Sequence, residues 1–395
     1  MIRMLPMMAD AVLSRRLLCF VSSLSMAAAI GCAGPAAKPI AAAKFDTTFK
    51  PLGYMMLVDS SLVVVDLFDM KEVDRFKVGH LAVHQVAVLP DNRTVYTGNH
   101  DDNTIVKLVF TDNGRKHTSQ IVAKSPVRLH LLGSSPDGRY VVITSRMELN
   151  ELMKLPQNSG LPDDSIAVLD TETDKIVKVL PLQSPAMPAF AIDGKFLYVN
   201  NAHHGSISVI ETAGWTEIQR VALYTEKLPP TDTGRAHVAP DGLDVSPDGK
   251  WVVSADYEAR SLTVFTVGTD GKLASPRKVP YPMAAGMPHD IRFAPDSKTF
   301  WVIDYDRLPD PGDEAGNAKI VTHVRVFDVV TLAEQRTMTF PRAVGRVALP
   351  VYSKNAFMTT KLGGLLAVDR ESGELQAEMV SGGLGVPVIC GMVSF

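Results

Sequence analysis

The sequence predicts an all-β fold, a seven-bladed β-propeller of four-stranded antiparallel blades. Three observations predict it. A hairpin pattern with a Pro-Asp type of turn recurs six times, roughly every 45 to 60 residues. A second hairpin pattern, with an acidic turn, occurs seven times. The two ends of the chain supply the strands that the first pattern lacks for a seventh blade.

The first pattern gives the two inner strands of a blade, A and B. Pro, Asp, Asn and Gly favour the turn, and the β-branched and aromatic residues that follow favour a strand. The clearest copies are "SPDGRYVVIT" and "SPDGKWVVSAD". The six copies begin at Leu89, Ser135, Ile192, Ser246, Ala294 and Tyr352.

The second pattern gives the outer strands, C and D, as in "SIAVLDTETDKIVKVLPL" and "GLLAVDRESGELQAEMV". Seven outer hairpins against six inner ones leave one inner pair missing. We expect "YMMLVDS" near the N-terminus to be strand B of that blade and "VPVICGMVSF" at the C-terminus to be its strand A. This closure leaves only short, protected strand edges.

The N-terminus predicts export. Arg15 and Arg16 precede the apolar run "LLCFVSSLSMAAAI", which is too short to span a bilayer comfortably. The residues "AIGC" resemble a bacterial lipobox, which implies lipidation of Cys32. We therefore expect a signal peptide of the lipoprotein type over residues 1–31, a tether over 32–44 and a single propeller over 45–395. The protein would be periplasmic or on the outer surface, held to the membrane only by its lipid anchor.

Charge and cysteine content narrow the classes of function. The formal net charge is −3, without the basic footprint of a nucleic-acid binder. Only Cys390 would remain as a free thiol after processing, and its apolar surroundings predict an inert, buried side chain. Disulfides and cysteine-based metal motifs are therefore not expected.

The stretch "YVNNAHHGSISVIET", residues 198–212, resembles the YVTN repeat of bacterial seven-bladed propellers. The resemblance extends unevenly over the repeats and implies the same fold. Propellers related to that family include cytochrome d1 haem domains, amine dehydrogenase heavy chains and lactonases. The fold is therefore specified much better than the activity.

The predicted site is the mouth of the central channel on the face that carries the B–C and D–A loops, named here the loop face. Three long insertions, 145–164, 223–240 and 305–319, all belong to that face. The opposite face carries mainly tight A–B and C–D turns. Binding residues tend to lie on loops held by a rigid scaffold, which favours the loop face.

Histidines gather just before or within the inner strands. Adding the arginines near these strands and the two histidines of the YVTN-like stretch, the candidate ligand-binding residues are His84, Arg128, His130, His203, His204, His237, His289 and Arg346. Of these, His84, His130, His237 and His289 are candidate ligands for a divalent metal or haem if they converge on the axis. Two alternatives stand beside this prediction. Each channel histidine can be hydrogen-bonded separately, and His203–His204 can be only a hairpin tip.

Three classes of function compete. The first is an exported binding module for a protein, a cell-envelope component or a small ligand, and the lack of a compact catalytic motif favours it. The second is a haem- or metal-dependent oxidoreductase or accessory protein, although no CxxCH motif for covalent haem is present. The third is a lactonase-like, metal-dependent hydrolase. The sequence requires no cofactor, and it specifies neither the ligand nor the oligomeric state.

Overall fold

The computed structural model describes residues 50–57, 59–79, 86–145, 161, 164–224, 240–279, 281, 286–306, 319–360, 363–380 and 388–389. All of them belong to the compact unit Pro39–Phe395. The predicted signal peptide and tether, and with them Cys32, lie outside these residues, as does Cys390.

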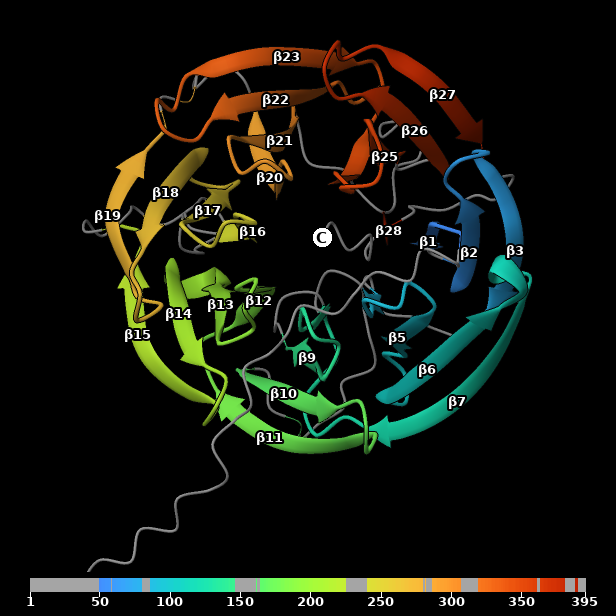
Figure 1. The fold of residues 1–395 in the computed structure, drawn as a ribbon. Helices are drawn as coiled ribbons and strands as arrows, with labels where there is room; N and C mark the ends of the chain where they lie inside the picture. Colours follow the sequence, from blue (N-terminus) through green and yellow to red (C-terminus); the bar gives the residue numbers. More distant parts are fainter. Residues whose placement is uncertain are drawn as a thin grey trace, which may run out of the picture. The chain divides into compact units, whose positions relative to one another are not determined.

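The described residues form 28 strands in seven four-stranded sheets, each antiparallel, and the sheets are arranged in a ring (Figure 1). The predicted seven-bladed β-propeller is thereby confirmed. We number the blades along the chain and give their strands from A to D. Blade 1 contains β28 (Val388–Ile389), β1 (Leu52–Met56), β2 (Ser61–Asp66) and β3 (Lys71–Lys77). Blade 2 contains β4 (Ala87–Val88), β5 (Thr94–Gly98), β6 (Thr104–Thr111) and β7 (Lys116–Lys124).

The next two blades follow the same pattern. Blade 3 contains β8 (Leu132–Ser134), β9 (Tyr140–Thr144), β10 (Ser165–Asp170) and β11 (Lys175–Pro181). Blade 4 contains β12 (Pro185–Phe190), β13 (Phe196–Asn201), β14 (Ser206–Glu211) and β15 (Thr216–Ala222). Two short 3-10 turns, η1 (Asp112–Gly114) and η2 (Ala202–His204), connect strands in blades 2 and 4.

The last three blades complete the ring. Blade 5 contains β16 (Pro240–Val245), β17 (Trp251–Asp256), β18 (Ser261–Val267) and β19 (Leu273–Lys278). Blade 6 contains β20 (Met287–Phe293), β21 (Thr299–Tyr305), β22 (Thr322–Asp328) and β23 (Glu334–Phe340). Blade 7 contains β24 (Val344–Ala348), β25 (Asn355–Thr360), β26 (Gly364–Asp369) and β27 (Leu375–Val380). In Figure 1, β12, β16 and β20 lie nearest the axis, and β15, β19 and β23 lie on the circumference.

Blade 1 is composite, as the sequence predicts. Strand β28 from the C-terminus pairs antiparallel with β1 from the N-terminus, with Met55 opposite Ile389 and Met56 opposite Val388. Figure 1 shows β28 beside β1, on the inner side of the blade. The ring is thus closed by hydrogen bonds between strands from its two ends.

The hydrophobic core lies between the blades. The buried apolar residues form seven clusters, one for each interface between neighbouring blades. Trp301 of blade 6 and Met358 of blade 7 share one cluster, and Met55 of blade 1 and Phe357 of blade 7 share another. Because each face of a blade packs on a neighbour, strands B and C are buried on both sides. This explains continuous apolar runs such as Leu62–Val65.

The YVTN-like stretch links blade 4 to blade 5. Tyr198 is fully buried, and its hydroxyl donates to the carbonyl of Gly271 at 2.9 Å. The side-chain amide of Asn200 donates to the carbonyl of Gly242, also at 2.9 Å. These two polar side chains satisfy backbone groups of the neighbouring blade, so they fix the relative position of the two sheets.

Candidate functional site

One register position repeats at the loop-face end of strand A. The first residue of the A–B turn donates its backbone N–H to the carbonyl five residues later, as Ser246 does to Trp251 at 2.9 Å. Counting five residues back from that turn residue gives His130 in blade 3, Asp241 in blade 5 and His289 in blade 6. The fold therefore brings these three residues to equivalent points of their blades.

Sequence reasoning missed Asp241. The histidine pattern selected His237 for blade 5, but the residue in register with His130 and His289 is the aspartate four positions later. Counting back from the "SPDG" turn would have found it, because the hairpin register is fixed by that turn. His237 itself and His84 lie outside the described residues.

Asp241 and His289 meet across the interface of blades 5 and 6. Nε2 of His289 lies 3.0 Å from Oδ2 of Asp241, within hydrogen-bond distance. The side chains are only 19% and 10% exposed, respectively. Each residue lies in a β-bulge, where the A–B register shifts by one residue. Such bulges redirect a side chain out of the regular alternation, here toward the neighbouring blade.

Gly242 allows this close approach. A Cβ atom at this position would lie 2.4 Å from the carbonyl oxygen of His289. A side chain at Gly242 would therefore push β16 and β20 apart. The Asp241–His289 contact therefore depends on position 242 being a glycine, which has no side chain.

The second nitrogen of His289 has no hydrogen-bond partner among the residues that the structure describes. This nitrogen, Nδ1, is buried. The rings of Tyr305 and Tyr257 lie 5.4 Å and 6.3 Å from the imidazole, measured between centroids. The carboxylate of Asp241 can accept a hydrogen bond from Nε2–H of His289, so Asp241 contacts only one of the two ring nitrogens.

A buried charge cluster lies next to this pair, between blades 6 and 7. Arg346 is 9% exposed, and its Nη1 lies 2.8 Å from Oδ1 of the fully buried Asp290. The other carboxylate oxygen accepts the backbone N–H of Val347 at 3.1 Å, and Arg292 approaches Oδ1 at 3.6 Å. Burial raises the pKa of Asp290, but the charges of Arg292 and Arg346 outweigh it, so the pKa lies below its ordinary value. Arg346 therefore neutralises a carboxylate of the protein itself.

A further carboxylate, Asp244, joins blades 5 and 6 below the mouth. Its Oδ2 accepts the backbone N–H of Phe293 at 2.7 Å. Burial raises the pKa of Asp244 to about 6, although Arg292 and the Phe293 N–H both lower it. The inner strands of these blades are thus joined by titratable side chains as well as by apolar contacts.

Blades 2 and 3 contain a second set of buried basic side chains near strand A. His130 is buried, and so is the Nε atom of Arg128, two residues before it in the sequence. His100, which follows β5, is also buried. Burial, together with the positive charge of Arg128, lowers the pKa of His100 to about 4. A contact with the Leu129 backbone acts in the opposite direction. His100 is therefore neutral at pH 7. The sequence analysis did not select it.

The His203–His204 pair lies in η2, between strands B and C of blade 4. Gly205 follows with φ of 53°, in the left-handed region that glycine adopts without strain. His204 is exposed. Whether this pair binds a ligand or is only a hairpin tip stays a prediction.

The four-histidine metal site stays a prediction. Two of its members lie outside the described residues, and the other two, His130 and His289, belong to blades 3 and 6. Within the described ranges, no three His, Cys, Asp or Glu side chains are grouped so that they could hold a metal ion. What the structure does bring together at the mouth is the pair Asp241–His289.

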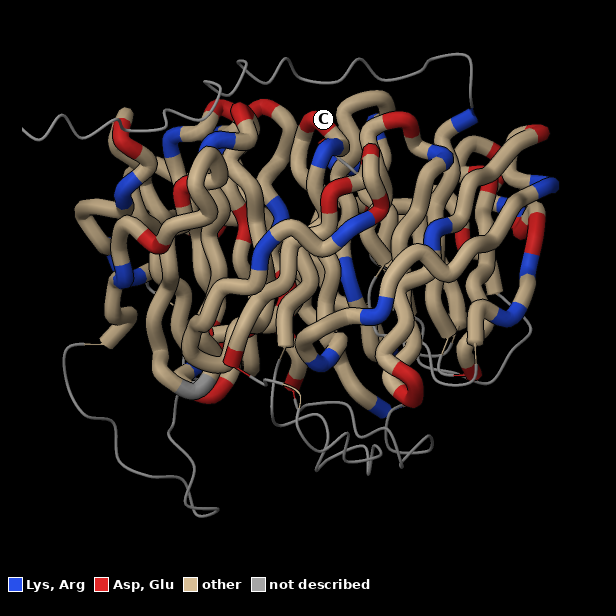
Figure 2. Tube along the Cα trace, turned by 90° about the horizontal axis from the view of Figure 1, so that it is seen from below, with Lys and Arg blue, Asp and Glu red and all other residues tan. Residues whose placement is uncertain are grey.

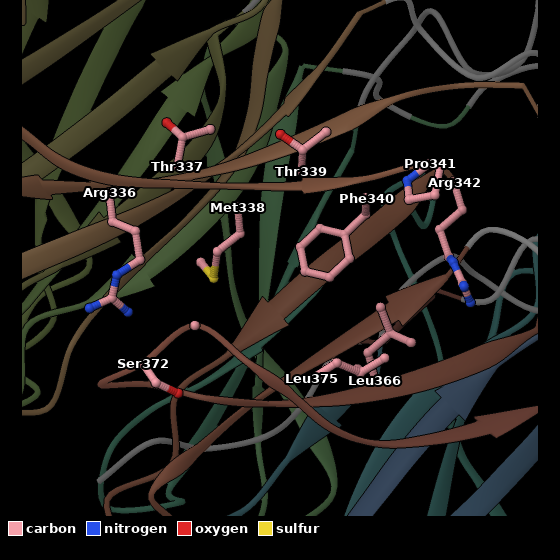
Figure 3. A pocket seen from close by; sticks show the side chains of 11 residues that line it. Arg336, Thr337, Met338, Thr339, Phe340, Pro341, Arg342, Leu366, Ser372 and Leu375 are labelled. Atoms are coloured by element: carbon pink, nitrogen blue, oxygen red, sulfur yellow. The ribbon is translucent and has the colours of Figure 1, made fainter.

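The described surface adds two observations. Acidic and basic residues are interspersed over the wall of the ring, as Figure 2 shows, which agrees with the near-neutral net charge. A groove of about 580 Å³ lies on the outside, between β23 and blade 7 (Figure 3). Met338, Phe340 and Leu375 line it, together with Arg336 and Arg342, and none of the predicted site residues does. Among the described residues, no helix has the length and apolar character needed to cross a membrane.

Comparison with known proteins agrees with the fold. The family described as "Lactonase, 7-bladed beta-propeller" matches residues 169–306, about a third of the chain. Hydrazine synthase subunit beta of Kuenenia stuttgartiensis is 27% identical over 238 residues. The alignment covers 53% of this chain and 60% of that relative, so the chain spans less than two thirds of the relative's length.

Two solved structures are similar. A functionally unknown protein from Desulfotomaculum acetoxidans DSM 771 aligns with a TM-score of 0.61 at 14% identity, over 86% of this chain and 99% of that one. Kuenenia stuttgartiensis hydrazine synthase aligns with a TM-score of 0.55 at 17% identity, over 77% of this chain and 87% of that one. At these identities the likeness shows the fold alone. The repeats, the seven closed blades and these matches together establish that the chain belongs to the seven-bladed β-propellers.

Proposed function

We propose that this chain is an exported binding module that holds a protein, a cell-envelope component or a small ligand at the loop face and the channel mouth. One observation carries the proposal: polar side chains of the inner strands of blades 5 to 7 are held in place by contacts across blades, as Asp241–His289 and Asp290–Arg346 illustrate. When the scaffold already fixes the side chains of a site, binding a ligand costs little further conformational entropy, and this favours affinity.

The test is site-specific photo-crosslinking in cells. We expect p-benzoylphenylalanine at His204 or Glu258, both exposed in B–C connections, to give covalent adducts of defined mass. The matched controls are Lys250, exposed in an A–B turn of the opposite face, and Val177 on β11, which is 49% exposed on the outer wall. Adducts at all four positions, or none at the loop-face positions, would contradict the proposal.

The export part of the proposal is tested separately. Cys32→Ser is expected to abolish lipid attachment and to move the protein from the membrane fraction to the soluble fraction, because a single thiol would carry the anchor. Metabolic labelling with a fatty acid and cell fractionation measure both effects. A wild-type protein that takes up no label, or a variant that stays in the membrane fraction, would count against the anchor.

A further inference from the structure

The groove on the outer wall, between β23 and blade 7, has no part in the proposed function. Its volume of about 580 Å³ is that of a typical ligand site. Apolar side chains of both blades line it, Met338 and Phe340 on β23 and Leu366 and Leu375 on β26 and β27. Leu375 is 50% exposed. An apolar group bound in the groove would remove this side chain from water, which favours binding.

One wall of the groove is the edge strand of blade 6. β23 is last in its sheet and pairs only with β22 among the described strands, so its outer edge carries unpaired N–H and C=O groups. Met338 and Phe340 point toward blade 7, whereas Thr337 and Thr339 lie on the other side of the strand (Figure 3). Both threonines still line the groove, so the groove borders the backbone of β23. An extended peptide matches such a wall, because its side chains alternate with the same period.

The charge of the groove differs between its ends. At one end, Arg342 pairs with Glu378. At the other, the guanidinium of Arg336 donates to the backbone carbonyl of Arg370 at 3.1 Å and to that of Glu371. Arg336 makes no ion pair with a carboxylate in the part of the chain that the structure describes. A carboxylate brought to this end would form a charge-assisted hydrogen bond with a cation that no described side chain neutralises.

We propose that this groove binds an extended peptide segment of a partner protein, with apolar side chains at two alternate positions and an acidic side chain two positions further along. The apolar side chains pack on Met338, Phe340 and Leu375, and the carboxylate pairs with Arg336. The peptide backbone adds to the free edge of β23. The inference goes beyond the proposed function, which concerns the loop face, and does not depend on it.

The mixed lining of the groove favours a peptide over an acyl chain. Threonine, serine and arginine groups line it beside the apolar side chains. A peptide offers these groups hydrogen-bonding partners, whereas a hydrocarbon chain would desolvate them without compensation.

The experiment measures the fluorescence anisotropy of labelled, end-capped peptides with the full chain. The probes are Ser-Leu-Thr-Leu-Thr-Asp-Ser and its reverse sequence, because the acidic residue reaches Arg336 in one direction or the other. We expect saturable binding of at least one of them. The control peptide is Ser-Leu-Leu-Thr-Thr-Asp-Ser, whose adjacent leucines point to opposite sides of an extended chain. It is expected to bind about tenfold more weakly, since one leucine loses its contact with the groove.

Substitutions in the chain test the named contacts. Arg336→Ala is expected to weaken binding by about tenfold, the usual contribution of a hydrogen bond to a charged group. Its matched control is Arg220→Ala, because Arg220 also lies on an outer strand, β15, but pairs with Glu217. Leu375→Ser is also expected to weaken binding, and its control is Val177→Ser, which changes a side chain 49% exposed on β11. Both controls are expected to keep the wild-type affinity, and circular dichroism establishes that each variant is folded.

A double-mutant cycle separates a direct contact from a structural effect. Replacing the aspartate of the peptide with asparagine is expected to weaken binding to the wild type, but to change binding to Arg336→Ala very little, because both changes remove the same contact. Additive losses would show that the carboxylate does not meet Arg336 and would contradict the proposal.

Other results would overturn the proposal as well. These are binding of neither probe, equal binding of the control peptide, or an equal loss in Arg336→Ala and Arg220→Ala. Saturable binding of oleate without binding of either probe would assign the groove to a lipid instead. None of these results bears on the crosslinking test at His204 and Glu258, so the two proposals can fail separately.

Discussion

Replacing Asp290 with alanine is expected to lower the free energy of unfolding by about 3–5 kcal/mol, the cost of breaking a buried ion pair. The carboxylate is fully buried, faces Arg346 at 2.8 Å and accepts the Val347 N–H. Its removal leaves two guanidinium groups, 9% and 21% exposed, without the charge that offsets their desolvation. The backbone N–H of Val347 loses its acceptor as well.

Chemical denaturation of wild type and variant measures this effect, with the denaturant slope as a check for two-state behaviour. Asp290→Asn is expected to cost less, because the amide oxygen still accepts from Val347. The surface control is Glu72→Ala, which removes a partly exposed pair with Arg75 on β3 and is expected to cost below about 1 kcal/mol. If Asp290→Ala cost no more than Glu72→Ala, the buried cluster would not hold blades 6 and 7 together.

Deleting residues 384–395 is expected to have an effect of similar size, and to lower both the unfolding temperature and the cooperativity of the transition. The deletion removes β28, which pairs with Met55 and Met56, two side chains no more than 2% exposed. Exposing them costs roughly 1.5–3 kcal/mol for each side chain that becomes fully exposed. It also leaves the inner edge of β1 unpaired.

Differential scanning calorimetry and amide hydrogen exchange of β1 measure the two consequences. Ile389→Pro in the full-length chain is the matched variant, because it removes one backbone N–H from the strand that pairs with β1. It is expected to shift the unfolding temperature in the same direction by a smaller amount. An unchanged transition after the deletion would show that the pairing of β28 with β1 adds nothing to stability.

The fold could be predicted from the sequence because its signals are local. An aspartate equivalent to Asp137 recurs in the turn of five of the six inner hairpins, and the strands between the turns are apolar on both faces. The number of hairpins then required a strand from each end of the chain, and the pairing of Met55 with Ile389 confirms that requirement.

The site could be predicted only in part, because its contacts cross blades. His130 and His289 stood out as histidines near inner strands, and the fold places them in one register. Nothing local in the sequence indicates that Arg346 pairs with Asp290, 56 residues earlier. Asp241 went unnoticed for a similar reason, since an aspartate within a "PDG" sequence looks like an ordinary turn residue until the neighbouring blade brings His289 to it.

The composite blade also determines the order in which the molecule can fold. Strands β1 and β28 are separated by more than three hundred residues, so bringing them together costs about 5 kcal/mol of loop-closure entropy. The pairing cannot begin until β28 has been synthesised. Until then the other blades form an open strip with a free strand edge at either end, and pairing of those edges with other chains competes with closure. We therefore expect the contact that closes the ring to form slowly, and the open strip to be the state most exposed to aggregation.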